Sequence, residues 1–200
     1  VTWGLLVSGQ SAPTGDRQFT DADLSGAQFT RCNLAGARFL NCDLRDVMLD
    51  SCQPSARISL RNWNLVDSKW YAVTLAGGSF ERGTVDAVTW RYATFEDDTL
   101  ESCTMRNLKL YRCSADDVRV EYGSLTDLDL RWVSLPNGRW SHVDLRNTRF
   151  EDCEFEDTSF YRGSFEDASF RSVSFRNAVL QDCDIRGLVI NGVRIEDLLH

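Results

Sequence analysis

A five-residue period near the C-terminal end constrains the fold of this chain more than any other feature. Phenylalanine occupies every fifth position there, and a small residue lies two positions before each one: Phe150, Phe155, Phe160, Phe165, Phe170 and Phe175 follow Thr148, Cys153, Thr158, Gly163, Ala168 and Val173. Neither the helical period near 3.6 residues nor the strand period of 2 produces this spacing. The chain therefore needs an architecture in which five residues form one structural unit.

The same period extends over most of the chain. If the large residue of each unit is position i, the central residues run from Phe19 to Leu49, shift by one residue within 53–57, and resume from Leu60 to Ile195. Two residue types test this register: all 11 phenylalanines occupy position i, and all seven cysteines occupy position i−2. One single-residue insertion therefore separates two stretches of the same repeat.

The cysteines are expected to be reduced core residues, because a free cysteine packs like a small hydrophobic side chain. No CxxC pair accompanies them, and the only histidines are His142 and His200, so the spacing typical of zinc sites is absent. A redox or metal role has only Cys32 and Cys52 in its favour, which the register stacks on adjacent turns. We predict no metal, no cofactor and a cytoplasmic location, which suits reduced thiols.

Several units match a known repeat. The segments ADLSG at 22–26, CNLAG at 32–36 and CDLRD at 42–46 resemble the pentapeptide-repeat family, whose units read roughly A(D/N)LxX, and TSFYR at 158–162 and ASFRS at 168–172 follow it more loosely. The resemblance covers about residues 17 to 199. It implies an all-β fold, a right-handed quadrilateral parallel β-helix. This solenoid would have roughly nine coils, with positions i and i−2 inside and the other three in solvent.

The two ends depart from the repeat. We divide the chain into an N-terminal capping segment, residues 1–16, and the repeat, residues 17–200. At the other end, too few residues follow Ile195 to fold over the last coil, and a bare end exposes apolar core and unpaired strands. We therefore expect either a homodimer through the C-terminal end or further residues beyond it. The first coil would be covered by Trp3, Leu5, Leu6 and Val7.

Because four units would make one coil, counting units by four assigns each unit to a side of the rod. This holds if the inserted residue does not move later units to a different side. Two opposite sides are acidic. The first acidic face, which has Leu75 and Phe95 as central residues, is a candidate binding surface with Glu96, Asp97, Asp116, Asp117, Glu154, Glu156 and Asp157. The second acidic face, which has Leu65 and Val85 as central residues, carries Asp67, Asp86, Asp127, Asp144, Glu166, Asp167 and Asp184.

The side between them, which has Trp70 and Trp90 as central residues, is basic and aromatic. We define the basic–aromatic face by its candidate binding residues: Tyr71, Arg91, Tyr92, Lys109, Tyr111, Arg112, Arg131 and Trp132. One interpretation is a solvated face on which exposed ion pairs between coils contribute little. The other is a protein interface, because exposed aromatic residues are enriched at interfaces.

Three inward positions carry unusual residues. Trp63 at i−2 is too large for a narrow interior, so we expect local distortion or a rotated side chain there. Asp98 at i−2 would bury a carboxyl group and needs hydrogen-bond partners. Ala115 at i would leave a void unless neighbouring coils fill it. Structural irregularity is the favoured account of all three, and a site role for Asp98 is the alternative.

The motifs favour a protein that is not an enzyme. The chain has no glycine-rich phosphate loop, GxSxG, HExxH or evident Cys–His couple. A convex rod has no obvious pocket in which adjacent acids such as Asp97 and Asp98 would act as a glycosidase pair. The net charge of −8 disfavours nucleic acids and anionic membranes, and no apolar run approaches the ~20 residues of a membrane span. We predict a scaffold that binds another protein through its charged and aromatic faces.

The alternative follows from the resemblance. Some pentapeptide-repeat proteins, of quinolone-resistance and toxin-immunity types, act as DNA mimics that bind DNA gyrase. The two acidic faces could imitate the phosphate rows of a duplex, which carries one charge per ~1.7 Å. The basic–aromatic face would then have to point away from the partner, and the C-terminal dimerisation segment of those mimics is not visible after Ile195. The expected partner is thus an unidentified protein or DNA gyrase.

Overall fold

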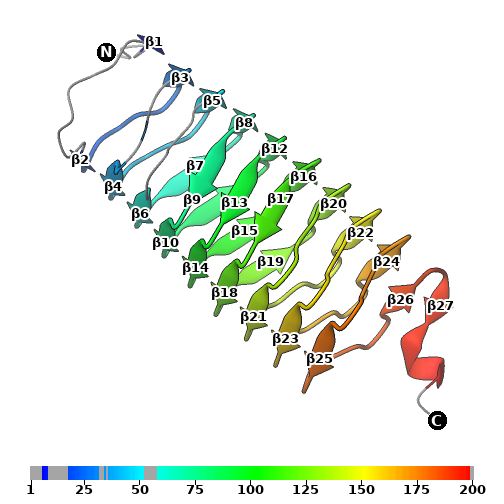
Figure 1. Cartoon of the computed structure of the whole chain (residues 1–200). Coiled ribbons are helices and arrows are strands. Elements are labelled where there is room, and N and C mark those ends of the chain that lie inside the picture. The colour runs from blue at the N-terminus through cyan, green and yellow to red at the C-terminus, as the bar shows by residue number, and fades with distance from the viewer. Residues whose placement is uncertain (1–5, 9–17, 32–33, 35, 52–57, 199–200) are drawn as a thin grey trace.

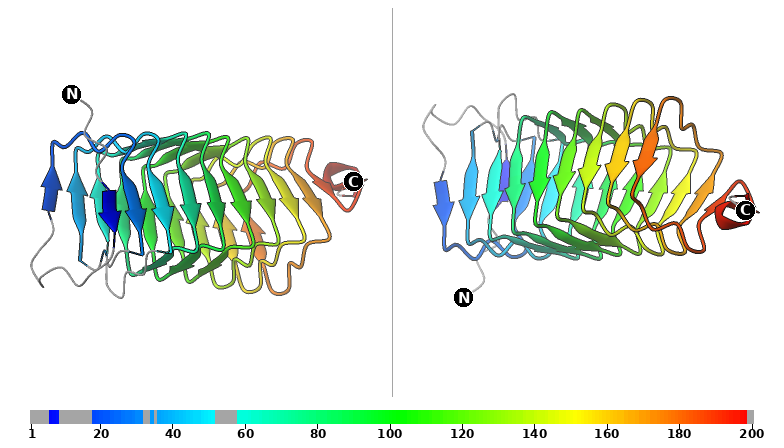
Figure 2. Two further views of the ribbon diagram at one scale, coloured as in Figure 1. Left: turned by 90° about the horizontal axis from the view of Figure 1, so that it is seen from above. Right: turned by 90° about the horizontal axis from the view of Figure 1, so that it is seen from below.

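The chain forms a rod of stacked coils (Figure 1). The computed structural model describes residues 6–8, 18–31, 34, 36–51 and 58–198 of the 200-residue chain. The views from above and below show successive coils stacked along one axis, from the blue strands to the red end (Figure 2). The strands are short, and those from β2 to β25 contain positions i−1, i and i+1 of one unit.

Two long sheets form opposite sides of the rod. The nine-stranded sheet agrees with the expected nine or so coils. Its strands, in order, are β2 (Gln18–Thr20), β4 (Arg38–Leu40), β6 (Ser59–Arg61), β10 (Ser79–Glu81), β14 (Thr99–Glu101), β18 (Arg119–Glu121), β21 (Arg139–Ser141), β23 (Ser159–Tyr161) and β25 (Val179–Gln181). The eleven-stranded sheet contains β1 (Leu6–Ser8), β3 (Gln28–Thr30), β5 (Met48–Asp50), β8 (Lys69–Tyr71), β12 (Thr89–Arg91), β16 (Lys109–Tyr111), β20 (Asp129–Arg131), β22 (Arg149–Glu151), β24 (Ser169–Arg171), β26 (Val189–Ile190) and β27 (Val193–Arg194).

Two shorter sheets form the remaining sides and carry the acidic faces. The second acidic face lies on β7 (Asn64–Val66), β11 (Thr84–Asp86), β15 (Thr104–Arg106) and β19 (Ser124–Thr126), and isolated bridges continue it to Asp184. The first acidic face lies on β9 (Thr74–Ala76), β13 (Thr94–Glu96) and β17 (Ser114–Asp116), continued by bridges to Ser174. The fold is therefore the all-β, four-sided parallel β-helix that the resemblance to pentapeptide repeats implies.

The register confirms the assignment of units to sides. Phe95 pairs with Ala115, and each parallel partner elsewhere in the repeat lies the same distance along the chain. Across the insertion Leu49 pairs with Trp70, one residue further, and both strands stay in the same sheet. The inserted residue is therefore absorbed within one coil, and the faces continue on both sides of it.

Each corner of the coil is made by position i+2, which has a positive φ even where the residue is not glycine. Asp97, Asp117 and Asn137 have φ of 54°, 52° and 57°. Aspartate and asparagine tolerate this left-handed conformation better than other side chains. The corners therefore explain why Asp and Asn recur at i+2.

The interior is a stack of aromatic and aliphatic side chains at i. Phe150, Phe155 and Phe160 are at most 1% exposed. The Phe150 ring lies flat against that of Phe170 on the next coil, with centroids 4.4 Å apart, and edge-on to Phe155 at 5.2 Å. Aromatic pairs favour offset stacking and edge-to-face contact, so the phenylalanine run stabilises the rod both along and around its axis.

The cysteines at i−2 are free, as expected, wherever the structure describes them: Cys42, Cys103, Cys113 and Cys153 are buried, and Cys183 is half-buried. The Cys153 thiol donates to the carbonyl oxygen of Leu130 at 3.5 Å, and burial raises its pKa to about 11. Cys32 and Cys52 lie outside the described residues.

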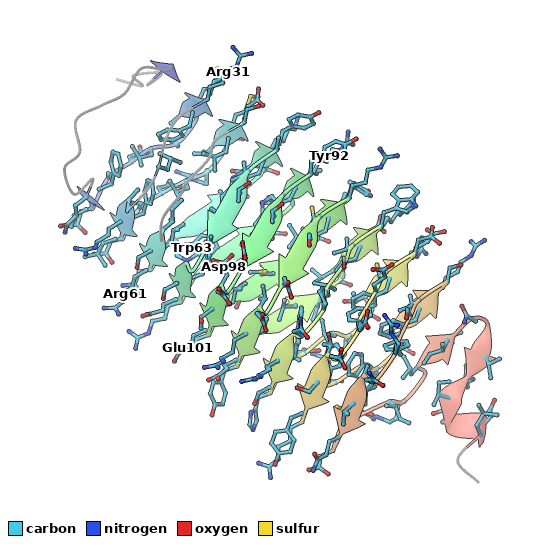
Figure 3. The ribbon with its side chains drawn as sticks, viewed as in Figure 1. Arg31, Arg61, Trp63, Tyr92, Asp98 and Glu101 are labelled. Carbon is cyan, nitrogen blue, oxygen red and sulfur yellow. The ribbon has the colours of Figure 1, made fainter. Side chains whose placement is uncertain are left out.

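Trp63 does not rotate outward, so of the two expectations, local distortion or a rotated side chain, the second was wrong. It is 3% exposed and packs against Phe80 with ring centroids 6.1 Å apart (Figure 3). Room for it comes from Gly83, the i−2 residue one coil further, where an added Cβ would lie 2.0 Å from the indole ring. A glycine on the neighbouring coil thus accommodates the oversized side chain.

Asp98 is fully buried and only partly hydrogen-bonded. Its Oδ1 accepts a hydrogen bond of 2.5 Å from the backbone N–H of Gly78, the i−2 residue one coil earlier. Its Oδ2 has no hydrogen-bond partner. Burial raises the pKa of this carboxyl to about 6, although the Gly78 N–H acts in the opposite direction. Asp98 is therefore a buried carboxyl whose ionised form is disfavoured in the folded protein. Ala115 is buried at 9% exposure beside Phe95, and a cavity of about 30 Å³ lies instead in the first coils.

The C-terminal end is partly covered, which corrects the expectation that too few residues remain to fold over it. The repeat stops at Ile190, and the chain reverses at Asn191 and Gly192, so that β27 pairs antiparallel with β26. Ile195 donates its N–H to Leu188 O, and the short 3₁₀ helix η1 (Ile195–Leu198) follows. The reversal covers the last coil only in part, because the inward side chains of Phe175, Leu180 and Ile185 stay partly exposed, and Val179 is exposed at the outward position beside Leu180. The homodimer expected there stays a prediction, and these side chains are the surface that it would bury.

At the other end, β1 extends the eleven-stranded sheet, because Val7 pairs in parallel with Phe29. Most of the predicted capping segment, residues 1–16, including Trp3 and Leu5, lies outside the described residues, so its capping role stays a prediction. Within the part of the chain that the structure describes, no helix has the length and apolar character needed to cross a membrane.

Gly83→Ala should destabilise the rod strongly, because the new methyl group would overlap the buried Trp63 ring. Overpacking of this kind costs about 1–3 kcal/mol or more in the free energy of unfolding, measured by urea titration. Gly163→Ala is the matched control, since an added Cβ there meets its nearest atom, Val143 O, at 3.3 Å. Combining Gly83→Ala with Trp63→Leu should restore much of the loss, and equal losses in the two alanine variants would contradict the packing.

Asp98→Asn should change how stability depends on pH. The folded-state pKa of about 6 lies above the ordinary value near 3.8, so the folded protein binds the extra proton between these values. Stability contributed by Asp98 is therefore fully present below pH 4 and falls as the pH rises through about 6, by roughly 2–3 kcal/mol. Asparagine resembles the protonated carboxyl, so the variant should gain stability over the wild type between pH 4.5 and 7.5. Asp97→Asn, at the exposed neighbouring position, controls for the loss of a negative charge. If the free energy of unfolding depends on pH in the same way in the wild type and both variants, the raised pKa of Asp98 is refuted.

Candidate functional site

The basic–aromatic face lies along the middle of the eleven-stranded sheet. Tyr71, Arg91, Tyr111 and Arg131 occupy position i+1 of β8, β12, β16 and β20, so they form one column along the rod. A second column stands at the corner beside it and consists of Tyr92, Arg112 and Trp132, with φ of 55°, 52° and 53°. The structure thus brings the predicted residues together on one side, and Figure 3 shows Tyr92 on the opposite side of the rod from Arg61 and Glu101. Their role in binding stays a prediction.

Arginine and aromatic residues alternate within each column, and an arginine in one column lies beside a ring in the other. We call this arrangement the checkerboard. In the first column, the Tyr111 ring lies between two guanidinium groups, with Arg91 at 5.4 Å and Arg131 at 6.0 Å from its centroid. In the second, the Arg112 guanidinium lies between two rings, 5.8 Å from Tyr92 and 5.7 Å from Trp132. Each cation–π contact contributes about 0.5–1 kcal/mol at an exposed site, so together they hold these side chains in place.

Carboxylates neutralise one of the three arginines of the checkerboard. Arg131 donates to both carboxylate oxygens of Asp129, at 2.9 and 3.0 Å, and lies 3.7 Å from Glu151. These carboxylates raise the pKa of Arg131 above its ordinary value. The Tyr111 hydroxyl also donates to Asp129, at 3.3 Å. Burial, followed by the nearby Asp129 charge, raises the pKa of Tyr111.

The other cations on this face are not neutralised. Among the described residues, Arg91, Lys109 and Arg112 form no ion pair with a carboxylate. An open groove of about 310 Å³ runs between the columns, lined by Arg91, Tyr92, Tyr111, Arg112, Arg131 and Trp132. Tyr92 and Trp132, which form part of its wall, are 46% and 53% exposed. The face therefore combines positive charge with exposed aromatic surface.

The first acidic face also holds its predicted residues together. Glu96 of β13 is the direct partner of Asp116 in β17, and Asp97 and Asp117 stand one above the other at the corner. Polar neighbours moderate part of this charge on later coils. Asn137 and Asn177 donate to Asp116 and Asp157, Ser134 donates to Glu154, and Arg176 forms an ion pair with Glu156.

Arginines on the same side of the rod partly neutralise the second acidic face, because they form ion pairs with Asp86, Asp144, Glu166 and Asp184. Arg146 donates to both oxygens of Asp144, at 2.8 and 2.7 Å, and Arg186 binds Asp184 in the same way. The arginine lowers the pKa of its aspartate in both pairs. Arg186 also lies 3.5 Å from Glu166. The two acidic faces, similar in sequence, therefore differ in how much charge they present.

A second aromatic cluster, on the nine-stranded sheet, was missed from the sequence. The Tyr122 ring, 61% exposed, stacks on His142 at 5.0 Å, and Tyr161 meets His142 edge-on at 6.0 Å. Arg162 lies over the Tyr161 ring at 4.8 Å. The sequence did contain a sign of this cluster, because Tyr122, His142 and Arg162 share position i+2 on successive coils. The same vertical alignment identified the basic–aromatic face.

The outward groups suit docking to another molecule. In the described ranges, no three His, Cys, Asp or Glu side chains are placed to hold a metal ion. Asp98, the one acid considered as an interior site residue, is sealed in the core and reaches no surface. What the surface offers is an arrangement of fixed charges and rings.

Comparison with known proteins agrees with the fold. Two family models, both for pentapeptide repeats, match residues 18–53 and 139–194. No curated protein matches the chain. The solved structure of HetL, a pentapeptide repeat protein involved in heterocyst differentiation regulation in the cyanobacterium Nostoc sp. strain PCC 7120, is similar with a TM-score of 0.50 and 16% identity, over 88% of this chain and 92% of that one.

Two further structures are more distant. Rfr23, a pentapeptide repeat protein from the cyanobacterium Cyanothece 51142, has a TM-score of 0.45 and 12% identity, over 60% of this chain and 90% of its own. QnrB1, a plasmid-mediated fluoroquinolone resistance protein, has a TM-score of 0.40 and 11% identity, over 90% of this chain and 97% of its own. With the repeat units, the four-sided coils and the family models in agreement, this chain belongs to the pentapeptide-repeat family.

Proposed function

We propose that this protein is a non-catalytic scaffold that binds another protein through its basic–aromatic face. The observation that carries the proposal is the checkerboard of rings and guanidinium groups around the groove, in which Arg91 and Arg112 contact aromatic rings instead of carboxylates. Aromatic residues and arginine are enriched at protein interfaces and dominate their binding energy.

The conformation of the corner residues supports this proposal. Tyr92 and Trp132 adopt a positive φ, which costs a bulky side chain on the order of 1 kcal/mol, and both leave about half of their surface in water. Elsewhere in the rod, the corners often use Asp, Asn or Gly. Large rings at these corners add little to the core, so their contribution is better explained by contact with a partner.

The mutual contacts also prepare the face for binding. Arg112 is held between two rings and donates to the Tyr92 hydroxyl at 3.2 Å. A side chain that is already ordered loses less conformational entropy when a partner docks, which saves about 0.5–1.5 kcal/mol for each long side chain. The rod thus presents a rigid surface that can bind without rearrangement.

The triple variant Tyr92→Ser, Tyr111→Ser, Trp132→Ser tests the proposal. We expect the fold to remain, as judged by circular dichroism and thermal melting, while capture of the partner from cell extract is lost. Tyr122→Ser with Tyr161→Ser removes aromatic surface from the nine-stranded sheet and is the matched control, which should capture the same protein as the wild type. The proposal fails if the triple variant unfolds, since the face is then structural, or if it retains the partner.

The first acidic face supports a second candidate, a DNA mimic that binds DNA gyrase. It stacks Glu96 on Asp116 and Asp97 on Asp117, which resembles a row of phosphates. The quinolone-resistance members of the family make gyrase the natural enzyme to test. The second acidic face gives this candidate less support than the sequence suggested, because arginines neutralise Asp144, Glu166 and Asp184.

A gyrase supercoiling assay tests this second candidate. A mimic should inhibit supercoiling or protect the enzyme from a quinolone, and Asp97→Asn with Asp117→Asn should weaken the effect severalfold by removing adjacent charges. Asp144→Asn with Arg146→Gln removes an ion pair without changing net charge and should leave the effect intact. Absence of any effect of the wild type at micromolar concentration rejects the candidate.

A further inference from the structure

We propose that the groove beside Arg91 and Arg112 binds the carboxylates of an acidic protein segment. This inference rests on the proposed function and gives the chemistry of the partner. It concerns one part of the basic–aromatic face, on β12, β16 and the corner that follows β16.

The two arginines have open hydrogen-bond donors. A guanidinium group has five N–H donors in a planar fork, and the face of an aromatic ring does not replace a carboxylate as their acceptor. Arg112 uses one donor for the Tyr92 hydroxyl, and Arg91 contacts the Tyr111 ring. Some arginines elsewhere on the rod, such as Arg61 and Arg146, meet a carboxylate within 2.8 Å. The groove therefore holds arginines oriented by their rings and ready for an anion.

The positive charges lie close together on adjacent coils. Arg91 belongs to β12, whereas Lys109 and Arg112 lie on the next coil, in and after β16. Adjacent strands are about 4.8 Å apart, so the carboxylates of one short segment can reach both arginines. Tyr111 and Trp132 border the same groove and offer apolar surface to the aliphatic parts of such a segment.

The surroundings favour a short acidic peptide over a long polyanion. Beyond Arg131 the next coil presents Glu151 and the exposed Asp152 in the two columns that hold the arginines and rings, and Arg149 is the one cation of its strand β22. Acidic faces flank the basic–aromatic face on both sides, and the net charge of the chain is −8. A nucleic acid long enough to extend past the groove would meet these carboxylates and be repelled, whereas a peptide with a few acidic residues would not.

The test uses synthetic hexaglutamate as the probe, with calorimetry and tryptophan fluorescence as readouts. Among the tryptophans of the described residues, Trp132 is half-exposed beside the groove, whereas Trp63, Trp70, Trp90 and Trp140 are buried. Quenching by the peptide in a Trp3→Phe background therefore reports on this site. We expect binding that weakens with added salt and becomes at least tenfold weaker in the variant Arg91→Gln, Arg112→Gln.

The matched control is Arg119→Gln with Arg139→Gln. These arginines are exposed direct partners on β18 and β21, and the described residues include no ion pair for either. Both double variants change the net charge from −8 to −10, because −8 − 2 = −10, so they differ only in where the charge is lost. The control should bind hexaglutamate as the wild type does.

Three results would overturn the inference: no binding of hexaglutamate, equal weakening in the two double variants, or equally strong binding of a six-nucleotide oligothymidylate, which would indicate a general anion site. Each is distinct from failure of the proposed function. If the peptide does not bind but the triple serine variant still loses its captured partner, the face binds a protein of different chemistry. If the triple variant keeps its partner, the proposed function itself fails.

Discussion

Backbone hydrogen bonds between successive coils are the constraint on which the rest of the structure depends. Asp129 donates its N–H to Leu108 O at 3.0 Å, and Arg149 donates to Leu128 O at 2.9 Å one coil further, as do equivalent residues along the rod. These bonds place each residue above the one at the same position of the previous coil. A one-residue slip would turn inward side chains outward, so the register is strongly specified, and the insertion before Leu60 is confined to one coil.

Because the coils are aligned along the rod, residues at the same position of successive coils form columns. The order of residues within a column determines which charges and rings a face exposes to solvent. Where Arg and aromatic residues alternate, as from Arg91 to Trp132, guanidinium groups contact rings and keep donors free. Where Asp and Arg share a unit, as in Asp144 and Arg146, the charges neutralise each other. Faces with similar numbers of charged residues therefore differ in what they can bind.

Unusual interior residues are accommodated by the same alignment. Trp63 fits because Gly83 lies at the same position of the next coil, and Asp98 finds its N–H donor at Gly78 on the previous one. Each solution involves a residue about twenty positions away along the chain. The unit around Trp63 alone suggested a distortion or a rotated side chain. The column of i−2 residues, in which Gly83 follows Trp63, indicates instead that the indole ring fits inside.

The sequence by itself determined the period and the inward positions, because the phenylalanines and the cysteines keep one register along the chain. The four-sided β-helix, and with it the membership of each face, followed from the resemblance of the units to pentapeptide repeats. The tertiary structure alone decided the contacts that depend on side-chain orientation and on the end of the stack. Those contacts include the ring–guanidinium checkerboard, the ion pairs of the second acidic face, the cluster around His142 and the hairpin after Ile190. The period assigns a residue to a column. An exposed side chain, however, can contact several neighbours with similar interaction energies, and only the stacked coils determine which of these contacts forms.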